Sequence, residues 1–81
     1  MEDNRQGRSA SEVSLHSVVA LLADLPERGL VRGQVGTVVE RLAPGVYEVE
    51  FSDDAGRTYA SLAVSGEQLL VLHHEPIHQA A

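Results

Sequence analysis

The four histidines are the side chains best suited to acid–base or metal chemistry, and they lie at the two ends of the sequence. They are His16 near the start and His73, His74 and His78 near the end. Imidazole is the commonest metal ligand, so the second group, with Glu75, would hold a divalent ion if a helix kept its members on one face. Pro76 opposes such a helix. We therefore predict no metal site and no bound cofactor.

Catalysis would require a nucleophile, a base and a group that stabilises charge, all within hydrogen-bond reach of one another. Serines are numerous, but none lies in a nucleophile-elbow pattern, and the histidines are confined to the ends of the chain. The sequence therefore predicts that the protein is not an enzyme, and it offers no catalytic residue.

Carboxylates are the most prominent polar feature of the central sequence. Glu48 and Glu50 alternate with apolar residues at a period of two, which places both glutamates on one face of a strand. Glu40, Asp53 and Asp54 lie nearby in the sequence. Such an acidic face would attract a basic protein and speed its association, although a face that is merely solvated is the alternative. Glu48, Glu50, Asp53 and Asp54 are our first candidate partner-binding residues.

The segment from Pro26 to Arg32 is a second candidate contact surface. Arg28 and Arg32 flank Gly29 in what the Pro and Gly residues predict to be a polar, irregular loop. Loops on a rigid scaffold commonly carry binding residues. We therefore add Arg28 and Arg32 to the partner-binding set.

Strands must position these side chains, and the sequence predicts five of them. Their expected ranges are 18–23, 35–42, 46–51, 58–64 and 69–72. Pro44 and Gly45 fit the central positions of a type II turn, Gly56 fits the left-handed position of a bulged hairpin, and residues 65–68 fit one 3-10 turn. Gly36 indicates a bulge or a close approach of the backbone.

Alternation along the strands predicts the core. Tyr47 and Phe51 are expected inside the fold, and Tyr59 is expected to be partly exposed. Further residues expected to face inward are Val49, Ala60, Leu62 and Val64, whereas Val35, Thr37 and Val39 share one side of their strand. One strand, a long loop, three further strands, a 3-10 turn and a last strand is the order of an SH3-like barrel.

The length of 81 residues leaves room for a single domain. We expect a flexible N-terminal tail over residues 1–12, the barrel over residues 13–72 and a flexible C-terminal tail over residues 73–81. The longest apolar stretch, Val18 to Ala23, is far shorter than the roughly 20 residues of a membrane span. The sequence has no cysteine and no signal-peptide pattern, which favours a cytoplasmic protein that does not contact a membrane.

The charge balance bears on the class of partner. Twelve carboxylates face six arginines and no lysine, giving a net charge of −6. This balance repels phosphate backbones and makes nucleic acid an unfavourable partner, whereas it suits a basic protein surface or serves solubility alone. A short chain also gains stability from self-association, so a homodimer is a further option.

An ordered series of motifs carries a family resemblance. Its main members are Val19-Ala20-Leu21-Leu22-Ala23-Asp24-Leu25-Pro26-Glu27, the run from Gly29 to Glu40, Tyr47-Glu48-Val49-Glu50-Phe51, Asp54-Ala55-Gly56-Arg57-Thr58-Tyr59-Ala60 and Gln68-Leu69-Leu70. The series resembles a bacterial domain-of-unknown-function family of series number 4926. The resemblance implies a bacterial SH3-like barrel without an established activity. It also implies small standalone proteins encoded near toxin-like or other uncharacterised partners, and hence an antitoxin or immunity role.

A shorter segment resembles two other groups of proteins. The run from Gly33 to Val38 is similar to KOW modules of ribosomal and elongation-factor proteins, and to the SH3-like domain of the nitrile hydratase β subunit. The first resemblance implies a nucleic-acid or ribosome-associated module, and the second an accessory subunit of a metalloenzyme. KOW modules that contact RNA usually carry basic loops, whereas the arginines of this chain stand among a surplus of acid.

Taken together, the sequence predicts an all-β, small five-stranded SH3-like barrel with one short 3-10 turn and flexible termini. It predicts a non-enzymatic protein-binding module, with an acidic antitoxin, immunity or accessory protein as its concrete role and a basic, co-encoded protein as its partner. The KOW-like module and the nitrile-hydratase-like accessory subunit are the alternatives.

Overall fold

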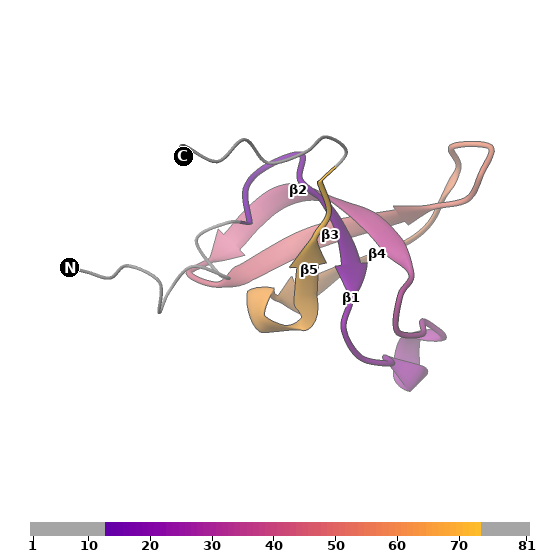
Figure 1. Cartoon of the computed structure of the whole chain (residues 1–81), viewed down its shortest axis with the longest axis horizontal. Coiled ribbons are helices and arrows are strands. Elements are labelled where there is room, and N and C mark those ends of the chain that lie inside the picture. Colours follow the sequence, from indigo (N-terminus) through magenta and orange to yellow (C-terminus); the bar gives the residue numbers. More distant parts are fainter. Residues whose placement is uncertain (1–12, 74–81) are drawn as a thin grey trace, which may run out of the picture.

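The protein is an all-β domain with the strand order of an SH3-like barrel, as the sequence predicts. The structure is a computed structural model that describes residues 13–73. Five antiparallel strands form one coiled sheet in the order β4-β3-β2-β1-β5 (Figure 1). Their bounds are β1 Val18–Leu21, β2 Val35–Ala43, β3 Val46–Ser52, β4 Thr58–Ser65 and β5 Leu69–Val71. The flexible tails were expected at 1–12 and 73–81; all of these residues except His73, which is exposed, lie outside the described residues.

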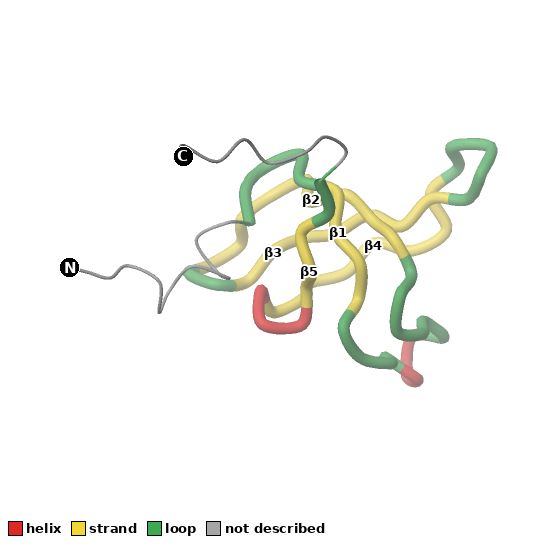
Figure 2. Tube along the Cα trace, viewed as in Figure 1, coloured by secondary structure: helices red, strands yellow, loops and turns green. Residues whose placement is uncertain are grey.

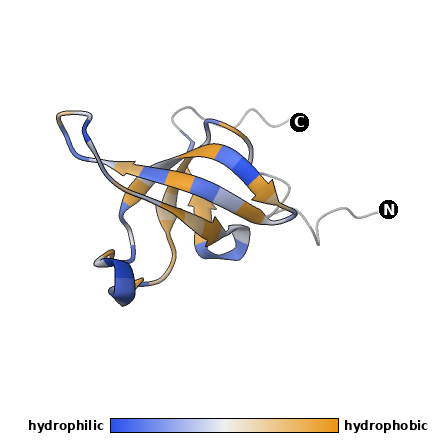
Figure 3. Ribbon diagram, turned by 180° about the vertical axis from the view of Figure 1, so that it is seen from behind, coloured by the Kyte–Doolittle hydropathy of each residue, from blue (hydrophilic) through white to orange (hydrophobic). Residues whose placement is uncertain are grey.

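The core lies on the inner face of the sheet, because successive side chains of a strand point to opposite faces. Phe51, Val49, Val38 and Val19 are each 0% exposed. Figure 3 shows the resulting alternation of hydrophobic and hydrophilic residues along the long strands. The other buried apolar residues include Tyr47, Leu62, Val64, Leu21, Leu69, Leu30 and Val13, and Ala60 packs against them. The predicted inward residues of β3 and β4 are thus confirmed, and Tyr59 is half exposed.

Gly36 lies where β2 packs closely against β3, between β1 and β3. It pairs with Val19 on β1 and with Phe51 on β3. A Cβ atom built on Gly36 would lie 2.7 Å from Cγ1 of Val49, 2.8 Å from the carbonyl oxygen of Glu50 and 2.9 Å from Cδ2 of Phe51. The close backbone approach predicted for this glycine is confirmed. Val35 and Thr37, the neighbours of Gly36 in the sequence, point to the opposite, outer face of the sheet. Val38, the next residue of β2 that points inward, is buried.

The β2–β3 connection is the predicted tight turn. Ala43 pairs with Val46, and Gly45 between them has φ 75°, the left-handed value that the third residue of a type II turn requires. At the end of β4, Ser65 caps a 3-10 turn at Gly66–Gln68 by accepting a hydrogen bond from the Glu67 amide at 3.2 Å. This turn, red beside β5 in Figure 2, leads directly into the last strand.

The β1–β2 loop is more ordered than the sequence indicated, since it contains a second 3-10 turn at Pro26–Arg28 (Figure 2). Pro26 presets the backbone angle that starts a helical turn, and Gly29 ends it with φ 71°. Leu25 and Leu30 exchange two backbone hydrogen bonds of 2.8 and 3.1 Å. Leu30 is buried in the core. The prediction of an irregular loop was therefore wrong, because Leu25 and Leu30 pair and hold the loop against the barrel, whereas its polar residues are exposed as expected.

Strand boundaries differ from the predicted ones by one or two residues. The first strand ends at Leu21 rather than Ala23, and the last ends at Val71 rather than Leu72. The second, third and fourth strands each extend one residue further. Two register shifts interrupt the pairing of β2 with β3, between Val38 and Glu40 and between Arg41 and Ala43. Such bulges increase the local twist of a strand and help a sheet to curl.

Candidate functional site

Three glutamates share the outer face of the sheet, opposite the core. Glu48 on β3 pairs directly with Glu40 on β2, and Glu50 pairs with Thr37 on β2 and with Ser61 on β4. Directly opposite residues have Cβ atoms about 4.5–5.5 Å apart, and like charges in such a pair are destabilising. We call Glu40, Glu48 and Glu50 the acidic outer face. This face brings Glu48 and Glu50, two of the predicted contact residues, together with Glu40 from the neighbouring strand β2.

Ser61 orients one of these carboxylates. Its hydroxyl donates a hydrogen bond of 2.6 Å to Oε2 of Glu48 across β3 and β4. This bond holds the carboxylate toward β4 and partly offsets the repulsion from Glu40. Sequence reasoning missed the role of Ser61, because the cross-strand neighbour of Glu48 depends on the register of two strands.

An apolar row continues the same outer surface toward the other edge of the sheet. Ala20 on β1 pairs with Leu70 on β5 and with Val35 on β2, so the three side chains lie side by side. Leu70 is 50% exposed and Val35 is 47% exposed. We call Leu70, Ala20 and Val35 the apolar outer row. Val35 lies two residues from Thr37, the cross-strand partner of Glu50, so the row and the acidic outer face adjoin.

The sequence offered only part of this apolar row. The shared side of Val35 and Thr37 was visible from their spacing, but Leu70 and Ala20 belong to strands that are far apart in the sequence. Strand pairing β5-β1-β2 brings the three together. Leu70 and Val35 are exposed on either side of Ala20, which is itself buried at 9% exposure, and exposed apolar side chains gathered on a sheet are typical of interaction surfaces.

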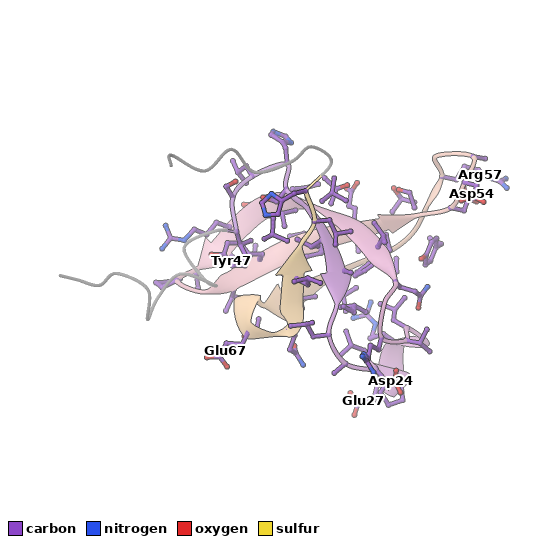
Figure 4. All side chains as sticks on the ribbon, in the orientation of Figure 1. Asp24, Glu27, Tyr47, Asp54, Arg57 and Glu67 are labelled. Atoms are coloured by element: carbon purple, nitrogen blue, oxygen red, sulfur yellow. The ribbon has the colours of Figure 1, made fainter. Side chains whose placement is uncertain are left out.

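Asp53 is used inside the β3–β4 turn. Its Oδ1 accepts hydrogen bonds from the backbone amides of Ala55 at 2.9 Å and Arg57 at 3.0 Å. Its Oδ2 lies 3.5 Å from Nε of Arg57 in an exposed ion pair. Asp53 therefore caps the backbone of its own turn, and its carboxylate is oriented toward that turn. Asp54 is exposed at the turn, where Figure 4 labels it with Arg57.

This arrangement gives a testable contrast between two adjacent aspartates. Asp53→Ala removes the acceptor of two backbone amides, so we expect the free energy of unfolding to fall by about 1 kcal/mol. Asp54→Ala should change it by less than about 0.5 kcal/mol, because the side chain is exposed and accepts none of these bonds. Urea denaturation of both variants checks the prediction. Equal losses would show that the turn does not depend on the Asp53 carboxylate.

Arg28 and Arg32 lie in a different part of the molecule from the acidic outer face. The β1–β2 loop that carries them and the β3–β4 turn project from the molecule at separate places, as the labels Asp24 and Glu27 against Asp54 show in Figure 4. The backbone amide of Arg32 donates to Oδ1 of Asp24 at 2.8 Å. Among residues 13–73, the guanidinium groups of Arg28 and Arg32 form no ion pair like that of Arg57 with Asp53. The six predicted contact residues therefore occupy three separate places.

The β1–β2 loop is joined to the start of β4 by side chains. Nε2 of Gln34 donates to the hydroxyl of Tyr59 at 2.9 Å, and Oε1 of the same amide accepts from the backbone amide of Val31 at 2.6 Å. These contacts connect the β1–β2 loop to β4. Gln34 is a structural residue that the sequence analysis did not single out.

Residues 13–73 contain no group of three or more His, Cys, Asp or Glu side chains that could hold a metal ion. His74 and His78 lie outside this range. A shallow depression at the β2–β3 hairpin is lined by Arg41, Leu42, Ala43 and Pro44, which provide no acid–base pair. Residues 13–73 include no helix that is long and apolar enough to cross a membrane.

Comparison with protein families gives a match over most of the chain. The family model described as a domain of unknown function, DUF4926, matches residues 15–71. The matched range contains all five strands and both 3-10 turns. No curated protein and no solved structure matches the chain.

Proposed function

This chain belongs to the DUF4926 family, a domain of unknown function, and from the outer surface of its sheet we propose that it is a non-enzymatic module that binds a basic protein. The observation that supports the proposal is the direct pairing of Glu40 with Glu48 beside Glu50. Like charges at opposite positions cost stability. A cationic partner would remove that cost on binding.

The apolar outer row supplies the apolar contact area that the carboxylates lack. Protein interfaces typically combine an apolar centre with a polar, charged rim, and Leu70 and Val35 are each about half exposed beside the acidic outer face. We therefore place apolar side chains of the partner over Leu70, Ala20 and Val35, and its arginines or lysines over the glutamates. Electrostatic attraction would speed the encounter, and burial of the apolar row would slow dissociation.

A concrete role that fits this chemistry is that of an acidic antitoxin, immunity or accessory protein in the cytoplasm of a bacterium. A toxin that acts on nucleic acid needs a basic surface. An acidic module can cover such a surface and compete with the phosphate backbone. Support comes from the net charge of −6 and from the placement of three glutamates on one face.

Charge reversal tests the proposal. The tagged chain is used to capture the proteins encoded beside its gene, at low and moderate salt, and the dissociation constant for the captured protein is then measured. In the double variant Glu48→Arg and Glu50→Arg, we expect that constant to rise about 10- to 100-fold. The matched control is Glu27→Arg with Glu67→Arg, which changes the net charge equally at exposed positions outside this surface. The control should change affinity about threefold or less.

Three results would contradict the proposal. Equal loss of affinity in the test and control variants would mean that total charge, and not this surface, governs binding. Salt-sensitive binding of RNA that is lost in Arg28→Ala and Arg32→Ala would favour the KOW-like alternative. Stable assembly with the subunits of a metalloenzyme, unaffected by the glutamate reversals, would favour an accessory subunit.

A further inference from the structure

The fourth strand is an open edge of the sheet. Among residues 13–73, β4 pairs with β3 alone, and it runs for eight residues from Thr58 to Ser65. Its sequence, Thr-Tyr-Ala-Ser-Leu-Ala-Val-Ser, has no charged residue and no proline. Proteins normally protect long edge strands with charges, prolines, bulges or short length, since exposed backbone groups can pair with another strand. The opposite edge, β5, is protected by its length of three residues.

The bulge in β4 leaves most of the strand regular. The register with β3 shifts between Phe51 and Ser52, next to Tyr59. Six consecutive pairs follow without interruption, from Phe51 with Ala60 to Val46 with Ser65. The part from Ala60 to Ser65 can therefore accept a further strand.

The hydrogen-bond alternation identifies which backbone groups point to the open edge. The amide of Gly66 donates to the carbonyl of Gly45, which continues the β3–β4 ladder beyond its last pair. Because bonded and non-bonded pairs alternate in an antiparallel ladder, Val64 and Leu62 bond to β3. The N–H and C=O groups of Ser61 and Ala63 then point away from β3, toward the edge.

We propose that β4 pairs in antiparallel fashion with β4 of a second copy of this chain, about a two-fold axis near Leu62. In this register Ser61 of each copy lies opposite Ala63 of the other. The N–H and C=O groups of Ser61 in each copy bond to the C=O and N–H groups of Ala63 in the other, and the two sheets become one. The uncharged strand is its own suitable partner, because no like charges meet across the axis.

Charge favours this edge over contact between the acidic outer faces of two copies. Contact between two acidic outer faces would bring six glutamates together. Edge pairing instead separates Glu48 and Glu50 on β3 from those of the second copy by three strand spacings, about 14 Å. That separation exceeds the Debye length of about 8 Å at physiological salt. The outer surface also stays open, so the dimer and the proposed partner do not compete.

Salt dependence separates this interface from the proposed function. Each chain carries a net charge of −6, so the dimer should tighten as salt screens the repulsion between copies, whereas binding of a basic partner should weaken. A single strand pair falls near or below the 1,200 Å² or so that marks the low end of stable interfaces. We therefore expect a dimer that forms with rising concentration.

The first experiment is sedimentation of the full chain from about 1 µM to about 500 µM at two salt concentrations. The expected result is a monomer–dimer equilibrium that shifts toward dimer at higher salt. In Ala63→Pro the dimer should be lost, because proline removes an edge amide that is not bonded to β3. Ala55→Pro is unsuitable as a control, since the Ala55 amide is bonded to Asp53. Ala55→Lys and Ala63→Lys form the matched pair instead, with loss of dimer expected only for Ala63→Lys.

Amide hydrogen exchange of the unchanged chain makes the test independent of whether Ala63→Pro folds. The amides of Ser61 and Ala63 should exchange rapidly at low concentration and at least about tenfold more slowly where the dimer predominates. Those of Leu62 and Val64 should be protected at both concentrations. A monomer throughout the concentration range, or a dimer that leaves Ser61 and Ala63 unprotected, would overturn the proposal.

Discussion

Gly36→Ala is expected to lower the free energy of unfolding by about 3 kcal/mol, and Gly36→Val to prevent stable folding. The added Cβ would lie within 3.0 Å of three atoms, and one of them is the backbone oxygen of Glu50. A flexible side chain could move aside, but a strand backbone held on both sides can do so only by opening the sheet. Urea denaturation of the two variants, followed by circular dichroism, measures the loss.

Gly33→Ala is the control for Gly36→Ala. Gly33 has φ 93° and nothing within 4 Å of an added Cβ, so alanine there costs backbone strain alone, about 1–2 kcal/mol. The expected order of stability is therefore wild type, then Gly33→Ala, then Gly36→Ala. A smaller loss for Gly36→Ala than for Gly33→Ala would show that the strands can separate around this position at little cost.

Phe51→Ala is expected to lower the free energy of unfolding by about 3–5 kcal/mol. Phe51 is the largest of the fully buried side chains, with 0% exposure, and it lies in the row that joins Gly36 of β2 to Ala60 of β4. An 81-residue domain has a total stability of about 4–12 kcal/mol. The variant should therefore be partly or wholly unfolded at 25 °C.

Tyr59→Ala is the aromatic control for Phe51→Ala. Tyr59 is 50% exposed and bonds to Gln34 through its hydroxyl, so its loss should cost about 1 kcal/mol. Thermal and urea unfolding of both variants give the comparison. Similar losses in the two variants would contradict the placement of the core on the Phe51 side of β3.

These two stability predictions also affect how binding experiments on the outer surface are interpreted. Glu50 and Phe51 are adjacent on β3, but they point to opposite faces. A substitution that destabilises the core would reduce the binding of any partner by unfolding the domain. The glutamate reversals change only the solvent side, so their folded fraction should stay near that of the wild type. Circular dichroism of each variant before the binding assay separates the two effects.

The acidic outer face and the open edge give this small domain two distinct surfaces. The acidic outer face and the apolar outer row span strands β2, β3, β1 and β5, whereas the edge belongs to β4. Ser61 belongs to both, because its hydroxyl bonds to Glu48 and its backbone faces the edge. We expect Ser61→Ala to weaken partner binding slightly and to leave the dimer unchanged, since pairing uses its backbone alone.

The sequence by itself determined the local features of this protein. The alternation in Val46–Ser52 placed Tyr47 and Phe51 inside, since the pleat of a strand sends successive side chains to opposite faces whatever its neighbours are. Pro44 and Gly45 specified their turn, and Asp53 specified the next, because these residues constrain the backbone within four positions. The need for glycine at position 36 was likewise readable from one residue type in a β-branched run.

Only the tertiary structure decided which of these features meet. Strand register determines that Glu40 lies opposite Glu48 and that Ser61 on the neighbouring strand reaches Glu48. It also places Leu70 beside Ala20, which lies beside Val35. Register is set by the packing of the whole core and by two bulges in β2, and a shift of one residue would reverse the faces. Arg28 and Arg32 were assigned to the same contact set as the glutamates from sequence alone, but the loop that carries them folds to another corner because Leu30 is buried there.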